Sequence, residues 1–370
     1  MTPQTPLSEI ALLFLRLGTT AFGGPAAHVA MMQSEVVDRR AWMTREHFLD
    51  LVGATNLIPG PNSTELAIHI GRERRGWAGL LVAGVCFILP AALIVLGIAW
   101  AYTRYGALPA VDGVLYGIKP VVVAVVIQAL WMLGRTAIKS IWLGAVAAGA
   151  LSASLLGVHE LIVLGAAAVI VAIGRGVGPR VTSAAWLPLP LLVSGGGPGL
   201  ASLFGVFVKI GTVLFGSGYV LIAFLRADLV ERLHWLTEAQ LVDAIAVGQV
   251  TPGPLFTTAT FVGYVVDGVV GAGLATLGIF LPAFVFVALS APLLPWLRRS
   301  AFARAILDCV NVASLALMAA VTISIAHSSL VDGPTIALAV LAAALLLWTK
   351  IGSTWLVVVG GVAGALLSLR

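Results

Sequence analysis

The sequence has little charge. Of its 370 residues only 10% are Asp, Glu, Lys or Arg, whereas 60% are hydrophobic and the mean hydropathy is +1.05. Soluble globular chains carry about 25% charged residues. Apolar runs of transmembrane length recur from end to end, and no stretch is long and polar enough for a soluble domain. The sequence therefore predicts an all-α polytopic membrane protein that passes the bilayer several times.

Cysteine is also scarce. Cys86 and Cys309 both lie in apolar segments, without a Cys-x-x-Cys spacing or paired histidines. This pattern favours a packing role and gives no indication of a zinc or redox site, so we expect no metal and no cofactor. The first ten residues contain no basic cluster and no cleavage site. The first helix is therefore expected to remain in the mature protein.

Acidic residues do not balance the basic ones, and the net charge is +5. The arginines fall in loops that flank apolar runs, where positive charge records membrane orientation. We therefore expect the protein to lie in the lipid bilayer and to bind no nucleic acid. A homodimer is compatible with the sequence.

The sequence does have Pro-Gly-Pro twice, at Pro59-Gly60-Pro61 and Pro252-Gly253-Pro254. A shift of 193 positions (207 minus 14) aligns residues 14–61 with 207–254 without a gap, and 14 of the 48 aligned positions are identical. This similarity indicates a duplicated membrane unit. We predict an N-terminal repeat at 1–180, a linker at 181–199 and a C-terminal repeat at 200–370.

Each Pro-Gly-Pro interrupts helical sequence, because proline removes backbone donors and glycine lets the chain turn sharply. The arms of the first break, 45–58 and 62–72, are shorter than the ~20 residues that a crossing helix needs. We therefore expect a re-entrant helical hairpin in each repeat, together with about five transmembrane helices.

Charge predicts that the repeats are inverted. Six arginines flank the first hairpin and indicate the cytoplasmic side: Arg39, Arg40, Arg45, Arg72, Arg74 and Arg75. The flanks of the second hairpin hold more acid and indicate the exterior. This topology places the amino terminus outside.

The hairpin breaks are candidate anion sites. A helix that begins after a break directs free amides and the positive end of its dipole toward it, and broken backbone at membrane depth survives where it lines a cavity or is covered by protein. The glycine motif at residues 22–25 and its counterpart at 215–218 also interrupt a helix. Arg16 and Lys209 align with each other inside otherwise apolar helices, where a buried cation is costly and usually functional. The residues predicted to bind substrate are Arg16, Lys209, Gly23, Gly24, Pro25, Asn62, Ser63, Thr64, Gly216, Ser217, Thr257 and Thr258.

Each of these features also has a structural interpretation. The breaks can shape packing, the glycines can serve close helix contacts, and Arg16 and Lys209 can reach the membrane interface. Four intramembrane groups are candidates for proton coupling: Asp50, Glu65, His69 and Asp243. Asp50 and Asp243 can equally pair with arginines. Thr44 and Thr237 are expected to cap helices.

Three motifs carry a resemblance to a known family. They are Phe22-Gly23-Gly24-Pro25 followed by His28, the run from Asn56 to Asn62, and the diverged copy that ends Gln249-Val250-Thr251-Pro252-Gly253-Pro254. The chain resembles the long-chain, two-repeat members of the chromate ion transporter family over nearly its full length. The resemblance implies export of chromate from the cytoplasm across the cell inner membrane, chromate resistance, and sulfate as a competitor.

Two other functions stay open. The first is a carrier for sulfate or another oxyanion such as molybdate, because basic residues and helix ends distinguish such ions poorly. The second is a membrane enzyme that acts on lipid phosphates, which should show a nucleophile with a base or a metal-ligand cluster. The six histidines are scattered without one, so we expect no enzymatic activity.

Overall fold

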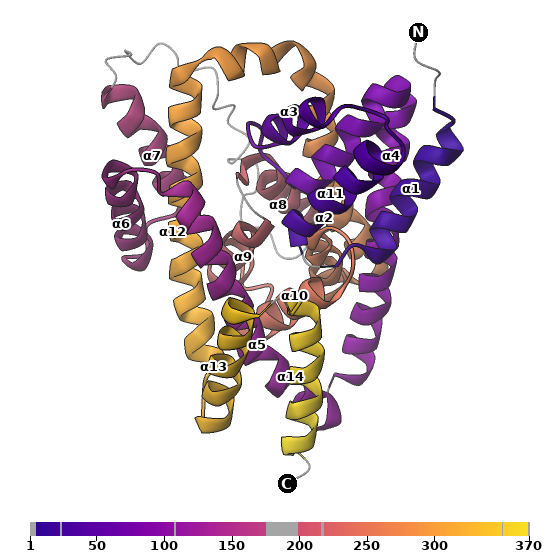
Figure 1. Cartoon of the computed structure of the whole chain (residues 1–370). Helices are drawn as coiled ribbons and strands as arrows, with labels where there is room; N and C mark the ends of the chain where they lie inside the picture. Colours follow the sequence, from indigo (N-terminus) through magenta and orange to yellow (C-terminus); the bar gives the residue numbers. More distant parts are fainter. Residues whose placement is uncertain are drawn as a thin grey trace.

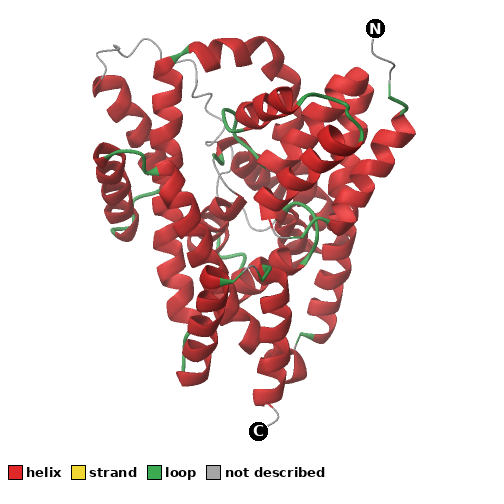
Figure 2. Cartoon of the chain, in the orientation of Figure 1, coloured by secondary structure: helices red, strands yellow, loops and turns green. Residues whose placement is uncertain are grey.

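The structure is a computed structural model, and it describes residues 5–22, 24–106, 109–174, 199–215, 218–349 and 351–368. All regular structure in these ranges is helical, as predicted (Figure 2). The elements, labelled in Figure 1, follow in the order α1 (Leu7–Thr20), α2 (Gly24–Gln33), η1 (Ser34–Arg39), α3 (Arg45–Thr55), α4 (Asn62–Tyr105), α5 (Pro109–Ala137), α6 (Ile141–Leu155), α7 (Glu160–Gly174), α8 (Leu200–Val213), η4 (Gly218–Val220), α9 (Leu221–Leu225), η5 (Arg226–Arg232), α10 (Glu238–Val250), η6 (Leu255–Thr257), α11 (Thr258–Arg299), α12 (Ala301–Ser329), α13 (Gly333–Trp348) and α14 (Ser353–Ser368).

The two halves of the chain contain the same succession of elements. In each half a 14-residue helix is followed by a short helix that ends in a π-helical turn, then by a short helix before Pro-Gly-Pro and by a long bent helix. Three further helices complete each half, α5 to α7 in the first and α12 to α14 in the second. The linker predicted at 181–199 lies outside the described residues, except for Gly199.

Local sequence signals explain where the hairpin helices begin. The Thr44 hydroxyl accepts a hydrogen bond from the backbone N–H of His47 at the start of α3. Thr237 forms a capping box with Gln240 at the start of α10. Both caps were expected from the sequence, and both satisfy backbone donors that the first helical turn leaves unpaired.

The long helices α4 and α11 each bend sharply at an equivalent glycine. Gly76 adopts φ 57° and ψ −140°, and Gly268 adopts φ 59° and ψ −150°. These backbone angles are available to glycine and strained for other residues. Gly71 before the first bend and Gly79 after it approach so closely that a Cβ on either would collide with the other's carbonyl oxygen. The two segments of α4 therefore fold back on each other.

The amino terminus lies beside the bend of α4, which differs from the expected topology. Arg74 donates hydrogen bonds to the Thr5 hydroxyl from Nε at 2.8 Å and from Nη2 at 2.7 Å. The charge pattern predicts the amino terminus and Arg74 on opposite sides of the membrane. The reason for the error is that α1, with 14 residues, is only about 21 Å long and ends before it could cross the ~30 Å hydrocarbon core.

Helices of the two halves pack against each other. α5 lies against α13 and α14, and α12 correspondingly lies against α6 and α7. At the crossing of α5 with α14, Gly117 faces Gly360 and Gly364, and a Cβ at Gly117 would collide with their backbone. Small residues of this kind let membrane helices approach closely. The core of the protein is therefore shared between the halves.

Within the described residues, four helical segments are long and apolar enough to cross a membrane: Asn62–Tyr105, Asp112–Ala137, Leu255–Ser290 and Ala305–Ser329. Two belong to each half. Five shorter apolar helices accompany them. The outer face of α4 exposes Leu81, Leu89 and Leu93 between Trp77 and Trp100. An apolar face between two tryptophans is typical of a helix in contact with lipid.

Candidate functional site

The two Pro-Gly-Pro breaks contact the ends of α1 and α8 in a reciprocal way. Ala21 (φ −81°, ψ 92°) follows α1, and Leu214 (φ −73°, ψ 110°) follows α8. The N–H of Gly60 donates to the Leu214 carbonyl oxygen at 2.8 Å, and the N–H of Gly253 donates to the Ala21 carbonyl oxygen at 2.8 Å. Each bond joins a break in one half to a helix end in the other half.

These bonds involve the tripeptides themselves, whereas the predicted anion donors are amides at the start of the helix that follows each break. Proline has no N–H, so glycine carries the only backbone donor of each tripeptide. Gly60 has φ +137° and Gly253 has φ +87°, which explains why glycine occupies both positions. Because both glycine amides already have carbonyl partners, neither is available to an anion in this conformation. Pro59, Pro61, Pro252 and Pro254 serve to fix the turn.

His28 links the end of α1 to the start of α4. Its Nε2 lies 3.0 Å from the Ala21 carbonyl oxygen, and its Nδ1 lies 3.3 Å from the Ser63 hydroxyl. A carbonyl can only accept, so Nε2 carries the hydrogen and Nδ1 of the neutral ring accepts from Ser63. The imidazole thus ties the end of α1 to the start of α4. Position 221, which aligns with His28, is a leucine and cannot form this link.

A cavity of about 460 Å³ lies where the predicted motifs meet. We call it the asparagine cavity. Residues from the first glycine motif, the first hairpin, the second glycine motif and helices α5 and α12 line it: Pro25, Asn56, Leu57, Asn62, Leu133, Thr136, Ala137, Lys139, Gly218, Val220, Leu307, Asp308, Asn311 and Leu315. Segments distant in the sequence and from both halves therefore build one site.

The polar lining consists mainly of carboxamides. The Asn62 side chain donates to the Asn56 side-chain oxygen at 2.7 Å. The Asn311 Oδ1 is buried and has no hydrogen-bond partner among the described residues. Rotation of this amide by half a turn would present its NH₂ group instead. At the exposed end of the cavity, the Lys139 Nζ lies 2.9 Å from an Asp308 oxygen.

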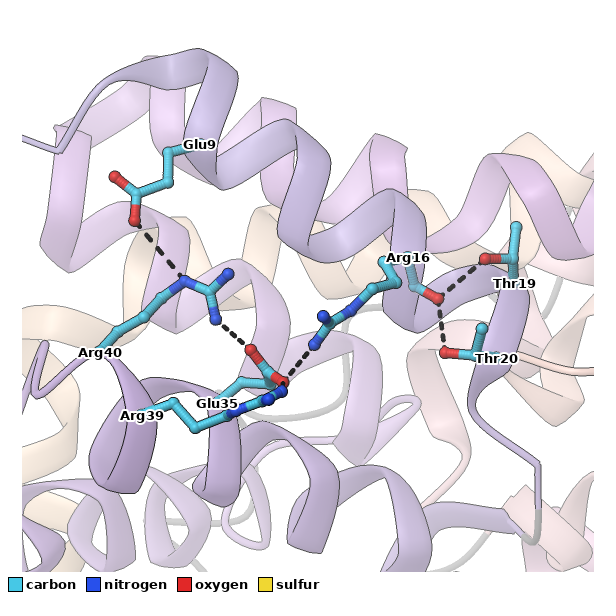
Figure 3. Close-up of polar contacts among 7 residues, drawn as sticks. All are labelled: Glu9, Arg16, Thr19, Thr20, Glu35, Arg39 and Arg40. Carbon is cyan, nitrogen blue, oxygen red and sulfur yellow. Dashed lines mark hydrogen bonds and ion pairs between the residues drawn. The ribbon is translucent and has the colours of Figure 1, made fainter.

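Arg16 does not line the asparagine cavity but binds Glu35, as Figure 3 shows. The Glu35 carboxylate, whose side chain is 7% exposed, also accepts from Arg39 at 2.7 Å and from Arg40. Burial favours the neutral form of this group, but the hydrogen bonds from the three arginines outweigh burial and hold the pKa of Glu35 below its usual value. Arg40 lies 3.5 Å from Glu9 as well.

Lys209 is paired in the same way in the second half. Its Nζ lies 2.6 Å from Oδ1 of Asp228, and Arg232 reaches the same carboxylate at 2.8 Å. Glu160 is a further neighbour at 3.9 Å. The Lys209 side chain is 5% exposed and that of Asp228 is 0% exposed. The two predicted substrate cations are therefore neutralised by carboxylates of their own half.

The sequence contained a signal for these pairs. Glu35 and Asp228 align under the same shift of 193 positions (228 minus 35) that aligns Arg16 with Lys209. An acid and a base that are duplicated together are expected to neutralise each other. The π-helical turns η1 and η5 contain Glu35 and Asp228. They place Glu35 next to α1 and Asp228 next to α8.

Comparison with known proteins identifies the family of the chain. The sequence profile of the chromate transporter family matches residues 8–173 and 201–365. The chain belongs to the chromate transporter family. It is similar to the chromate transport protein of Cupriavidus metallidurans, with 33% identity over 97% of this chain and 92% of the relative. The corresponding protein of Pseudomonas aeruginosa is 31% identical, covering 98% and 92%, and the probable chromate transport protein of Synechococcus elongatus is 29% identical, covering 98% and 96%.

No solved structure matches the chain significantly. Membership in a transporter family, together with the apolar helices, makes this chromate transporter a multi-pass membrane protein. The predicted family membership and the predicted transmembrane character are thereby confirmed.

The acidic groups named for proton coupling have different environments in this transporter. Asp50 is exposed on α3, whereas Asp243 is buried and lies 3.2 Å from the Lys119 Nζ. Tyr102 donates a hydrogen bond to Asp243 at 2.9 Å. Glu65 and His69 are both buried in the first segment of α4. The alignment of Asp50 with Asp243 thus does not extend to their surroundings.

The remaining predicted ligands are hydroxyl groups and glycines. The Thr257 hydroxyl donates to the Pro254 carbonyl at 2.8 Å, and the Thr258 hydroxyl donates to the Leu255 carbonyl at 2.8 Å. Both hydroxyls therefore bond to backbone carbonyls of their own helical turn. Thr64 is buried in the first turn of α4. Gly24 begins α2, while Gly23, Gly216 and Ser217 lie outside the described residues.

A larger cavity of about 720 Å³ lies beside η5, where His159, His327 and Arg226 contribute to its lining. Its arginines already have acidic partners: Arg226 binds Glu231 and lies 2.6 Å from Glu238. None of the predicted ligands lines this cavity. We therefore take the asparagine cavity as the candidate site.

The Lys209–Asp228 pair gives a test of a purely structural role. We expect Asp228→Ala to lower the free energy of unfolding by about 3–5 kcal/mol, because it leaves Lys209 buried with only a distant acid. The double variant Lys209→Met/Asp228→Leu should recover most of this loss. Thermal unfolding in detergent measures both, with Asp308→Ala as the control, because that exposed pair contributes at most about 1 kcal/mol. Equal stability of Asp228→Ala and wild type would show that the pair is not structural.

Proposed function

We propose that this chromate transporter exports chromate from the cytoplasm and that the anion binds in the asparagine cavity. The observation that carries the proposal is the meeting of both glycine motifs and the first hairpin break around one space lined by three asparagine amides and Lys139. The relatives named as chromate transport proteins support chromate as the substrate.

The donors of this cavity suit an oxyanion. Chromate is a tetrahedral dianion whose oxygens only accept hydrogen bonds, and carboxamide NH₂ and ammonium groups supply donors. Once the Asn311 amide is rotated by half a turn, its NH₂ group occupies the position that has no partner and can donate to an anion oxygen. Sulfate has the same charge and shape, so a sulfate carrier is the second candidate.

The direction of transport follows from charge. Lys139 is 62% exposed at one end of the cavity, and Arg135 lies one turn before it. Positive loops favour the cytoplasmic side, so the cavity would load from the cytoplasm of a cell bounded by its inner membrane. Moving a dianion outward across a membrane that is negative inside releases about 4.6 kcal/mol per 100 mV, twice the value for one charge. Chromate resistance would follow from this export.

We further propose that residues 1–180 and 200–370 are inverted repeats that open the site alternately to the two sides. The reciprocal bonds of Gly60 and Gly253 support a two-fold relation. From the bends of α4 and α11 onward the shift between the halves is 192 positions (268 minus 76), so Asn311 corresponds to Lys119. In the first hairpin Asn56 and Asn62 face the same cavity as Asn311. In the second hairpin Asp243 is instead paired with Lys119, the counterpart of Asn311. One side would thus be open while its counterpart is closed.

Uptake of labelled chromate into inverted membrane vesicles tests the proposal. Vesicles that contain the protein should accumulate chromate when their lumen is made positive, and vesicles from cells without it should not. Excess sulfate should compete. Accumulation of sulfate with no chromate uptake would favour the second candidate, and uptake of neither would exclude both.

A further inference from the structure

Glu65 is the most isolated ionisable group that the structure describes in the first hairpin. Its side chain lies in the first turn of α4 and is 0% exposed. Neither carboxyl oxygen has a hydrogen-bond partner within the described residues. An ionised carboxylate without donors is very costly in a membrane interior, so a group of this kind is usually functional.

The carboxyl group lies inside the Pro-Gly-Pro break. A Cβ at Gly60 would collide with Oε1 of Glu65 and would lie 3.7 Å from the Ala283 Cβ. The neighbouring cluster of α4 and α11 is apolar and includes Ile58, Ile68 and Val287. The break therefore holds the acid between backbone and hydrocarbon.

The titratable and charged groups around this position are few. On α4 itself, His69 follows one turn later, and Arg72 follows two turns later and donates to the Val287 carbonyl of α11. From α2, the His28 Nδ1 lies 3.3 Å from the hydroxyl of Ser63, two residues before Glu65. The end of α8 contributes the Leu214 carbonyl to Gly60, and α11 contributes Ala283. None of these forms a described ion pair with Glu65.

The second half has no acid at this place. Glu65 follows Pro61 by four residues, and Thr258 follows Pro254 by four. Thr258 is buried, and its hydroxyl donates to the Leu255 carbonyl at 2.8 Å. A helix can thus follow such a break without an acid at this position, and helix structure does not explain the carboxyl group of Glu65.

The acid is close to the asparagine cavity along the helix. Asn62 lines the cavity and precedes Glu65 by three residues, a spacing that places two side chains on one helix face. A negative charge on Glu65 would repel a dianion in the cavity, and low polarity around the acid strengthens this repulsion. Protonation would remove it.

We propose that Glu65 binds one proton when the anion enters the cavity, and that proton and anion cross the membrane together. The carboxylate becomes a carboxylic acid on binding and returns to a carboxylate when both leave. This inference rests on the proposed function, since it requires an anion in the asparagine cavity.

Calorimetric titration of purified protein with chromate at a series of pH values tests the inference. Titration in two buffers of different ionisation enthalpy counts the protons taken up. We expect wild type to take up about one proton more per chromate than Glu65→Gln, and its affinity to fall up to tenfold more per pH unit at alkaline pH. Glu65→Gln should bind at every pH about as tightly as wild type binds at low pH.

The control is Glu46→Gln, an exposed acid on α3, which should behave as wild type. Chromate's own titration is common to all variants and cancels in the comparison. Glu65→Thr, which copies the second half, serves if the glutamine variant does not fold. Equal proton uptake by wild type and either Glu65 variant would overturn the inference and leave chromate binding intact. Absence of chromate binding by wild type would overturn the proposed function and the inference with it.

Discussion

Replacing Gly253 by valine is expected to abolish chromate uptake into vesicles and to lower the amount of folded protein. Gly253 has φ +87°, a conformation that costs a β-branched residue about 1–3 kcal/mol. Its Cβ would lie 2.7 Å from the Ala91 Cβ and 3.0 Å from the Gly18 carbonyl oxygen. Relief of these contacts would move the second break away from α1 and break the bond to Ala21, which lies beside His28.

The matched control is Gly273→Val on α11, where a Cβ would meet nothing within 4 Å. This variant should accumulate and transport as wild type does. Folded protein can be quantified by size-exclusion chromatography before uptake is measured. Normal uptake by Gly253→Val would mean that the reciprocal bonds between the breaks and the helix ends are dispensable.

Reversing the charge of Lys139 is expected to weaken chromate binding about 100-fold. Lys139 and Asp308 are the charged residues described in the lining of the cavity. Each unit of charge near a dianion at the surface of a protein changes the interaction by about 1–3 kcal/mol. Lys139→Glu changes two units and leaves an unpaired acid next to Asp308. Binding calorimetry at low salt measures the loss, and added salt should reduce the difference between the variant and wild type.

Two further variants separate charge from position. Arg104→Glu makes the same change of charge at the end of α4, outside the cavity lining. This variant should bind chromate as wild type does. The exchange Lys139→Asp/Asp308→Lys keeps the pair and should restore part of the affinity. An affinity of Lys139→Glu within about twofold of wild type would place the anion elsewhere.

Local signals in the sequence were sufficient for part of the fold. The positions of both breaks and the threonine caps depend on residues near one another in the chain, and the structure contains them. Pro25 and Asn62, both predicted to bind substrate, line the asparagine cavity, and their role as ligands stays a prediction. The sequence could not show which carbonyls the amides of Gly60 and Gly253 would meet, because Ala21 and Leu214 come from opposite halves of the chain.

The expected positions of charged residues were less reliable. Arg16 and Lys209 appeared to be cations awaiting a substrate because their partners are 19 residues away, beyond the range of helix periodicity. Asn311 was missed because a single asparagine in an apolar helix has no motif around it. The amino terminus was placed on the wrong side because hydropathy does not reveal that the chain turns back after Ala21. All of these features depend on contacts made in three dimensions.

The exchange of hydrogen bonds between the halves has a consequence for biosynthesis. The ribosome releases the first half into the membrane long before residue 253 is made, so during that interval the Ala21 carbonyl and the Gly60 N–H both lack the partners that they have in the finished protein. Unpaired backbone groups are costly in a lipid environment. A nascent chain that stops between the halves therefore lacks both of these bonds, and it differs chemically from the completed protein in a way that a membrane protease or insertase could detect.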